Sequence, residues 1–182
     1  MINCNDRAIL KALAFAKKSH KGQKRRYSGN DYVEHPIRVC NLVARTDGCT
    51  VDMCISALLH DVVEDTGITI NDIELNFGID VACIVGWLTD VSKLSDGNRV
   101  VRKEIDRLHS EKSPPEAQTI KLADLIDNSE SIIKRDSNFA KVFMPEMDKL
   151  TMSLRKGDAD LSFKARTIVR EYYSKNIIKV EV

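Results

Sequence analysis

The sequence predicts an all-α fold, built as a bundle of several helices. Apolar residues recur at helical spacing almost throughout the 182 residues. No segment shows sustained alternation of apolar and polar residues between hairpin turns, so strands are not expected. The chain is 43% hydrophobic and 30% charged, the balance of an ordinary globular protein, and its length fits one domain. We therefore expect a single domain over residues 1–182, with the C-terminal helices at about 137–175 packed on it.

Turn and cap residues divide the N-terminal half into helices. Gly22 opens a loop that carries a basic stretch, and Pro36 suits the first turn of the helix that follows. Thr50 and Thr69 are typical N-cap residues, and Asp72 stands at the third position of the helix that Thr69 caps. The helices expected here are about 5–18, Pro36 to about Arg45, Thr50 to Gly67, and a short one from Thr69.

The C-terminal half continues the helical pattern, with no repeat or interdomain linker. Gly157 separates the two closing segments, and Pro145 is expected to kink or interrupt the first of them. Both segments are rich in Lys and Arg, which is typical of a solvated face, so no nucleic-acid partner is expected. The helices expected in this half are about 78–90, 98–111, 115–134, 137–156 and 158–175.

Cysteine usage and hydropathy exclude several protein classes. Five cysteines with no Cys-x-x-Cys pair argue against a disulfide framework and against a thiolate zinc site. The first twenty residues lack the pattern of a signal peptide. No apolar run approaches the roughly 20 residues that span a bilayer. We expect a cytoplasmic protein with no membrane partner.

Charge is distributed unevenly along the chain. Residues 46–92 contain nine acids and no Lys or Arg, whereas residues 17–26 contain six Lys or Arg and no acid. The fold could bring a cation-binding wall and a phosphate-binding wall to one cleft, or these segments could form two solvated faces.

The most informative motif is the run His-Asp-Val-Val-Glu-Asp at positions 60–65, which ends an apolar helix. Its polar groups would lose much hydration free energy if they turned inward unpaired, so a metal or another cation is expected beside them. Helical spacing places Glu64 on the same face as His60. Asp65 shares the neighbouring face with Asp61, so possible ligands and a possible base are aligned.

Further residues extend this motif to a site with four ligands. His35 stands at a helix start, Asp124 lies in the segment Lys-Leu-Ala-Asp, and Asn128 follows Asp124 by one helical turn. A His, a His-Asp pair and an Asp on separate helices allow a bundle to converge four nitrogen and oxygen ligands on one ion. These ligand types suit Mn, Fe, Co, Ni or Zn. The predicted metal ligands are His35, His60, Asp61 and Asp124.

Taken together, these motifs resemble the HD superfamily, and within it the alarmone hydrolases, which include the hydrolase half of RelA/SpoT enzymes and the metazoan SpoT homologue. The resemblance spans nearly the entire chain, and the string His-Asp-x-x-Glu-Asp-Thr is its diagnostic part. The segments that carry it are His20 to Gln23 with Arg25 and Arg26, Ser28-Gly29, Tyr32, His35-Pro36, Ala57 to Thr66, Leu88 to Lys93, and Ile120 to Asp124 with Asn128.

The resemblance implies an HD bundle around a single divalent metal ion, with Mn²⁺ as the first choice. It implies a hydrolase that removes the 3′-pyrophosphate of (p)ppGpp, giving GDP or GTP and pyrophosphate. By the same resemblance, Glu64 and Asp65 would orient and deprotonate the attacking water. General chemistry supports these roles, because a divalent ion lowers the pKa of a bound water and a nearby carboxylate can take its proton. The nucleotide contacts that it implies are Lys24, Arg25, Arg26, Ser28, Asn128 and Ser131.

Two segments depart from the family pattern, Asn30-Asp31 and Leu125-Ile126-Asp127. Neither is expected to touch the metal ligands, but both bear on base specificity and on the rigidity of the basic loop.

Two other classes of function stay open, and so does the oligomeric state. The same metal chemistry fits other phosphorylated nucleotides, such as NADPH, ppApp or a dNTP, because a fold does not fix a substrate. A non-catalytic nucleotide-binding protein is the third class, and the intact pair Glu64 and Asp65 argues against it.

Overall fold

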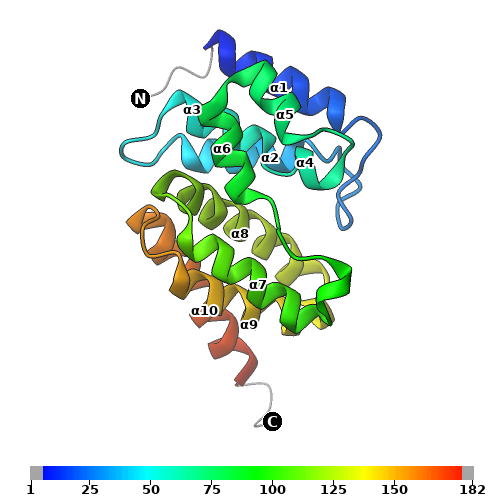
Figure 1. Cartoon of the computed structure of the whole chain (residues 1–182). Helices are drawn as coiled ribbons and strands as arrows, with labels where there is room; N and C mark the ends of the chain where they lie inside the picture. Colours follow the sequence, from blue (N-terminus) through cyan, green and yellow to red (C-terminus); the bar gives the residue numbers. More distant parts are fainter. Residues whose placement is uncertain (1–5, 178–182) are drawn as a thin grey trace.

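The computed structural model describes residues 6–177, which form helices joined by mostly short loops (Figure 1). Within this range there is no strand, and only an isolated antiparallel bridge joins Lys24 to Asp31. The prediction of an all-α fold is confirmed. None of the helices in the described range is long and apolar enough to cross a bilayer.

The order of the helices agrees with the prediction from the sequence. Pro145 was expected to kink or interrupt its helix; it lies inside the continuous helix α9, so the helix is not interrupted there. The helices are α1 (Arg7–Ser19), α2 (Glu34–Val43), α3 (Val51–Leu59), α4 (Val62–Asp65), α5 (Ile70–Phe77), α6 (Ile79–Leu88), the 3₁₀ turn η1 (Leu94–Asp96), α7 (Arg99–Lys112), α8 (Pro115–Arg135), α9 (Ser137–Ser153) and α10 (Ala159–Ile177).

The helix predicted from Thr50 to Gly67 is two helices in the structure. Thr50 caps α3 as expected, but α3 ends at Leu59, and a separate single turn, α4, follows. The break falls at His60, whose imidazole Nδ1 lies 2.9 Å from the carbonyl oxygen of Ala57. This contact satisfies one of the carbonyls that a helix end leaves without a backbone partner. The chain therefore turns at the His-Asp pair.

Helix α8 is the centre of the bundle. It contacts α2, α3 and α6 as well as α7, α9 and α10. In Figure 1, α1 to α6 lie on one side of α8, and α9 and α10 lie on the other. Gly157 permits the close approach of the chain before α10 to α8, because a Cβ atom there would lie 2.7 Å from Cδ1 of Leu122 and 3.1 Å from the carbonyl carbon of Gln118.

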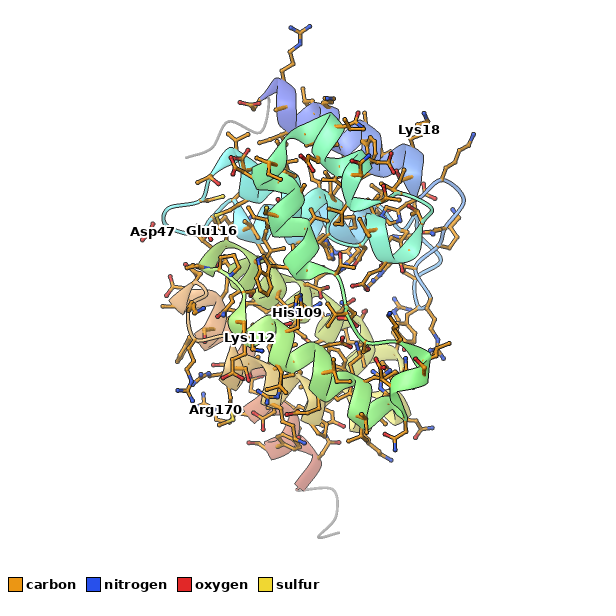
Figure 2. The ribbon with its side chains drawn as sticks, viewed as in Figure 1. Lys18, Asp47, His109, Lys112, Glu116 and Arg170 are labelled. Atoms are coloured by element: carbon orange, nitrogen blue, oxygen red, sulfur yellow. The ribbon has the colours of Figure 1, made fainter. Side chains whose placement is uncertain are left out.

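The segment that joins α6 to α7 is held by side chains of α7. Asp106 accepts hydrogen bonds from the backbone nitrogens of Val91 and Ser92, at 3.1 and 2.9 Å. The His109 ring stacks on Trp87 with their centroids 4.7 Å apart, and Figure 2 labels His109 on α7. These contacts fix the segment that starts at Asp90, which borders the candidate site.

Candidate functional site

Four side chains that the sequence singles out meet inside the bundle. His35 lies in the first turn of α2, His60 and Asp61 lie between α3 and α4, and Asp124 lies on α8. Nε2 of His35 is 3.1 Å from Oδ1 of Asp124 and 3.4 Å from Oδ2 of Asp61. Nε2 of His60 is 3.0 Å from the same oxygen of Asp61 and 3.7 Å from that of Asp124. Two imidazole nitrogens and two carboxylate oxygens therefore face one another at short range.

The hydrogen bonds of the two rings leave both Nε2 atoms directed at this cluster. Because a carbonyl only accepts, Nδ1 of His60 must donate to Ala57, and the Nε2 lone pair of the neutral ring is free to bind a cation. Within residues 6–177 that buried Nε2 atom has its ion-pair contacts with Asp61 and Asp124 but no hydrogen bond. Nδ1 of His35 lies 2.6 Å from Oδ2 of Asp127. With Nδ1 donating to this carboxylate, Nε2 of His35 is likewise left to bind a cation. The donor set fits a divalent transition metal ion.

The electrostatics of the cluster favour positive charge. Burial lowers the pKa of His35, but its hydrogen bonds with Asp124, Asp127 and Asp61 outweigh burial and raise the pKa to about 9. Burial also opposes the charged form of His60, and Asp61 and Asp124 nevertheless raise its pKa. Desolvation disfavours the charged forms of both Asp61 and Asp124, and the two histidines lower the pKa values of these carboxyls. The cluster therefore favours a positive charge at this point, which a divalent ion would supply.

The segment Leu125-Ile126-Asp127 was expected not to touch the predicted metal ligands, and this expectation is wrong because Asp127 contacts His35. Its carboxylate is 2.6 Å from Nδ1 of His35, and it accepts hydrogen bonds from Nε and Nη2 of Arg38 at 2.6 and 3.1 Å. It follows Asp124 by three residues, so it lies on the same face of α8. That spacing is the signal that could have identified it. Asp127 orients the His35 ring and fixes its tautomer.

Two further side chains hold the carboxylates of the cluster. The Tyr32 hydroxyl donates to Oδ2 of Asp61 at 2.7 Å. The Asn128 amide donates to Oδ1 of Asp124 at 2.6 Å, so Asn128 contacts a predicted ligand as well as the loop described below. Each carboxylate therefore has a fixed direction before any ligand binds.

The acidic pair, Glu64 and Asp65, lies in α4 beside the cluster. Glu64 accepts a hydrogen bond from the backbone nitrogen of Asp90. Because α3 ends at Leu59 and α4 begins at Val62, Glu64 does not lie on the same helix as His60, contrary to the prediction from the sequence. Desolvation and the nearby Asp90 carboxylate raise the pKa of Glu64 to about 7, although its side chain is exposed. Desolvation and the charge of Asp61 raise the pKa of Asp65. The raised pKa of Glu64 suits a group that exchanges protons near neutral pH.

Lys121 supplies a cation beside these acids. Burial opposes its charge, but Asp124, Asp90 and Glu64 outweigh burial and raise its pKa. Lys121 therefore stays protonated and offsets part of the negative charge around the cluster.

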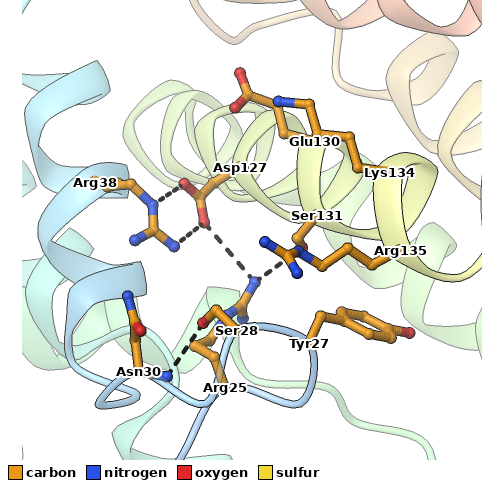
Figure 3. A pocket seen from close by; sticks show the side chains of 10 residues that line it. All are labelled: Arg25, Tyr27, Ser28, Asn30, Arg38, Asp127, Glu130, Ser131, Lys134 and Arg135. Atoms are coloured by element: carbon orange, nitrogen blue, oxygen red, sulfur yellow. Dashed lines mark hydrogen bonds and ion pairs between the residues drawn. The ribbon is translucent and has the colours of Figure 1, made fainter.

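The predicted nucleotide contacts divide into two groups. Arg25 donates to Oδ1 of Asn128 at 3.0 Å and lies 3.4 Å from Oγ of Ser131, so three of the predicted residues meet. Arg25, Ser131 and Ser28 line a pocket next to Asp127 (Figure 3). Lys24 instead pairs with Asp31 at 2.7 Å on the surface, and neither Lys24 nor Arg26 lines this pocket.

Arg26 is exposed and lies 3.8 Å from Asp136. The basic loop therefore presents Arg25 inward and its two basic neighbours outward.

Comparisons with known proteins agree with this arrangement. The model of the HD domain family matches residues 12–141. The chain is 38% identical over 122 residues to the guanosine-3′,5′-bis(diphosphate) 3′-pyrophosphohydrolase MESH1 of Xenopus tropicalis, and the match covers 66% of each protein. It is 31% identical over 176 residues to MESH1 of Drosophila melanogaster, covering 90% of this chain and 93% of that protein.

A solved structure extends the likeness to most of the chain. This solved structure is that of a metazoan ortholog of SpoT that hydrolyzes ppGpp and plays a role in starvation responses. The two structures agree with a TM-score of 0.82 at 28% sequence identity, over 93% of this chain and 98% of that one. With the family match and the cluster of two His and two Asp, these findings show that the chain belongs to the HD domain family, in the group that includes the MESH1 proteins.

Proposed function

We propose that this protein is a metal-dependent phosphohydrolase that removes the 3′-pyrophosphate of (p)ppGpp, giving GDP or GTP and pyrophosphate. The observation that carries the proposal is the convergence of His35, His60, Asp61 and Asp124. The buried Nε2 of His60 faces this cluster and makes no hydrogen bond within the described residues. Membership of the HD domain family implies a bound divalent metal ion. The names of the relatives support the substrate, and Mn²⁺ is the proposed metal.

In this proposal the four residues hold the ion, and one domain over residues 1–182 carries the reaction. A divalent ion there would lower the pKa of a bound water and offset the charge of the scissile phosphate. Asp127, Tyr32 and Asn128 keep the ligand atoms in place through the hydrogen bonds described above. Lys121 would stabilise the charge of the leaving pyrophosphate.

Glu64 and Asp65 are the proposed catalytic residues. A base works best when its pKa lies near the working pH, and the environment of Glu64 raises its pKa to about 7. Glu64 would accept the proton of the attacking water, while Asp65, one turn beyond Asp61, would orient that water. Arg25, Asn128, Ser131 and Ser28 would bind the rest of the nucleotide from the pocket side.

The substrate is tested with a panel of compounds. Purified protein is incubated with Mn²⁺ and, separately, ppGpp, pppGpp, ppApp, NADPH and dNTPs, and the products are separated by anion-exchange chromatography. We expect GDP and pyrophosphate from ppGpp at the highest kcat/KM. A higher kcat/KM for NADPH or a dNTP would show that this compound, and not ppGpp, is the preferred substrate. The proposed metal chemistry would still hold.

The pH profile should follow the base. Glu64 must be deprotonated to accept a proton, so kcat should fall as the pH drops below about 7. The charge of a bound metal ion would move this limb to a somewhat lower pH. The measurement is kcat for ppGpp between about pH 5.5 and 8.5, at saturating Mn²⁺ with the metal content checked at each pH. A flat profile with constant metal content would contradict the role of Glu64.

Two neighbouring arginines should behave differently. Arg25→Ala should raise KM for ppGpp about tenfold or more, because it removes a partly buried guanidinium that lines the nucleotide pocket. Arg26→Ala is the matched control, since Arg26 is exposed and does not line the pocket. Steady-state kinetics with both variants, each with unchanged metal content, make the comparison. Equal effects of the two substitutions would place the nucleotide outside the pocket.

A further inference from the structure

Three cysteines gather between α2 and α3. Cys40 lies on α2 and is buried, Cys54 lies on α3 and is 1% exposed, and Cys49 lies in the loop between them and is half-buried. Sγ of Cys49 is 3.6 Å from Sγ of Cys54, and Cys54 shares a further hydrogen bond with Cys40. The three sulfurs do not all lie within 4.8 Å of one another, so a reaction between two of them is favoured over a shared metal ion. None of these thiols takes part in the proposed hydrolysis.

The surroundings of Cys54 favour its thiolate. The hydrogen bond with Cys40 has the largest effect on the pKa of the Cys54 thiol, burial opposes it, and the bond with Cys49 adds to it, so the pKa falls to about 7. Cys54 also stands in the first turn of α3, where the field of the helix favours an anion. The thiolate is the form in which cysteine acts as a nucleophile. The pair of Cys49 and Cys54 therefore holds a reactive sulfur at neutral pH.

The loop from α2 to α3 gives the pair access to solvent and room to move. Cys49 is partly exposed there, and the loop lies at the edge of the molecule, where Figure 2 labels Asp47. Gly48 has a φ of +73°, and a Cβ atom at that position would meet no atom within 4 Å beyond its chain neighbours. A disulfide needs its sulfurs about 2.05 Å apart, so a small shift of this loop would close the gap of 3.6 Å. Cys40 and Cys54, in contrast, belong to helices whose close packing resists such a shift.

We propose that Cys49 and Cys54 are a site of reversible oxidation, at which hydrogen peroxide converts the two thiols to a disulfide. Either sulfur can hold the proton that the pair shares, so the accessible Cys49 can react as the thiolate. Its sulfur attacks one oxygen of the peroxide, the O–O bond breaks, and the leaving hydroxide takes the proton of Cys54 to give water. The Cys54 thiolate then attacks the sulfenic acid of Cys49, which forms the S–S bond and releases a second hydroxide, and a proton from solvent converts it to water. The two sulfurs lose two electrons, and the peroxide gains them.

Such a bond differs from a disulfide framework, which the number and spacing of the cysteines argue against. Disulfides in reducing compartments are commonly transient and serve to sense oxidants. This one would tie the loop after α2 to the first turn of α3, the helix that ends next to His60. The proposal concerns the thiols alone and does not depend on the proposed function.

The test oxidises the full wild-type chain and locates the bond by mass spectrometry. Reduced protein is treated with a small excess of hydrogen peroxide, alkylated in denaturant, and digested with a protease that cleaves before aspartate. Cleavage before Asp52 separates Cys49 from Cys54, so their disulfide appears as a cross-link between two peptides. We expect this cross-link to form and both cysteines to lose their alkylation together, while the exposed Cys83 on α6 keeps its own. Dithiothreitol should restore the alkylation of both.

Two variants provide the controls. Cys83→Ser removes an exposed thiol outside the pair and should form the same cross-link at the same rate. Cys49→Ser should form none, and Cys54 should then stay open to alkylation, because its buried sulfur has lost its accessible partner. A cross-link from Cys54 to Cys40, full alkylation of the wild-type pair after oxidation, or oxidation of Cys54 at the wild-type rate in Cys49→Ser would overturn the proposal. None of these measurements uses a nucleotide, so the result holds whether or not ppGpp is cleaved.

Discussion

Glu64→Gln should lower kcat for ppGpp by roughly 10²–10⁴-fold, the range typical for loss of a general base. The amide keeps the size of the side chain and can still accept the backbone hydrogen bond of Asp90, but it cannot take a proton. The affinity for Mn²⁺ should survive, because Glu64 contacts none of the four cluster side chains through a hydrogen bond. The measurement combines steady-state kinetics with metal analysis of the purified variant.

The control for this substitution is Glu74→Gln. Glu74 is an exposed acid on α5, so its replacement should leave kcat and metal content unchanged. Near-normal turnover of Glu64→Gln would remove Glu64 as the base. Loss of bound metal from that variant would instead recast Glu64 as a ligand.

Asp127→Ala should weaken Mn²⁺ binding by about 10–100-fold, the usual cost of removing a carboxylate that orients a metal-binding histidine. The His35 ring would lose the acceptor that fixes its tautomer, and Arg38 would lose its bidentate partner. Calorimetric titration of the stripped protein with Mn²⁺ measures the effect directly, without reference to turnover. Thermal unfolding of the metal-free variant shows whether the fold itself is retained.

The conservative variant separates orientation from charge. Asn at position 127 can still accept a hydrogen bond from Nδ1 of His35, so Asp127→Asn should lose less affinity than Asp127→Ala. Asp80→Ala, an exposed acid at the start of α6, is the control and should bind Mn²⁺ as the wild-type protein does. Wild-type affinity in Asp127→Ala would show that the ring is held without this carboxylate.

Local sequence patterns predicted the helices and the four members of the cluster. Helical periodicity and the caps at Thr50 and Thr69 depend on neighbouring residues, and the structure has both caps. The cluster could be predicted because one His, a His-Asp pair and one Asp on separate helices can converge on one ion in a bundle. That these residues meet is now a geometric fact, whereas their binding of a metal stays a prediction.

Contacts between distant segments could not be predicted in the same way. The link from Asp127 to His35 spans 92 residues, and the link from Arg25 to Asn128 spans 103. The end of α3 at Leu59 is accompanied by a contact between the His60 ring and the carbonyl oxygen of Ala57. The periodicity of apolar residues gives no signal for such a contact.

The central claim is that one divalent ion, held by His35, His60, Asp61 and Asp124, is required to cleave ppGpp. It is tested most directly by following the rate of pyrophosphate release from ppGpp while chelator-stripped protein is titrated with Mn²⁺, in the wild type and in Asp124→Asn. We predict no release without metal, a rise to a plateau at one Mn²⁺ per chain in the wild type, and little activity at the same metal concentration in Asp124→Asn. Full pyrophosphate release from the stripped protein, or an unchanged titration curve in Asp124→Asn, would contradict the account.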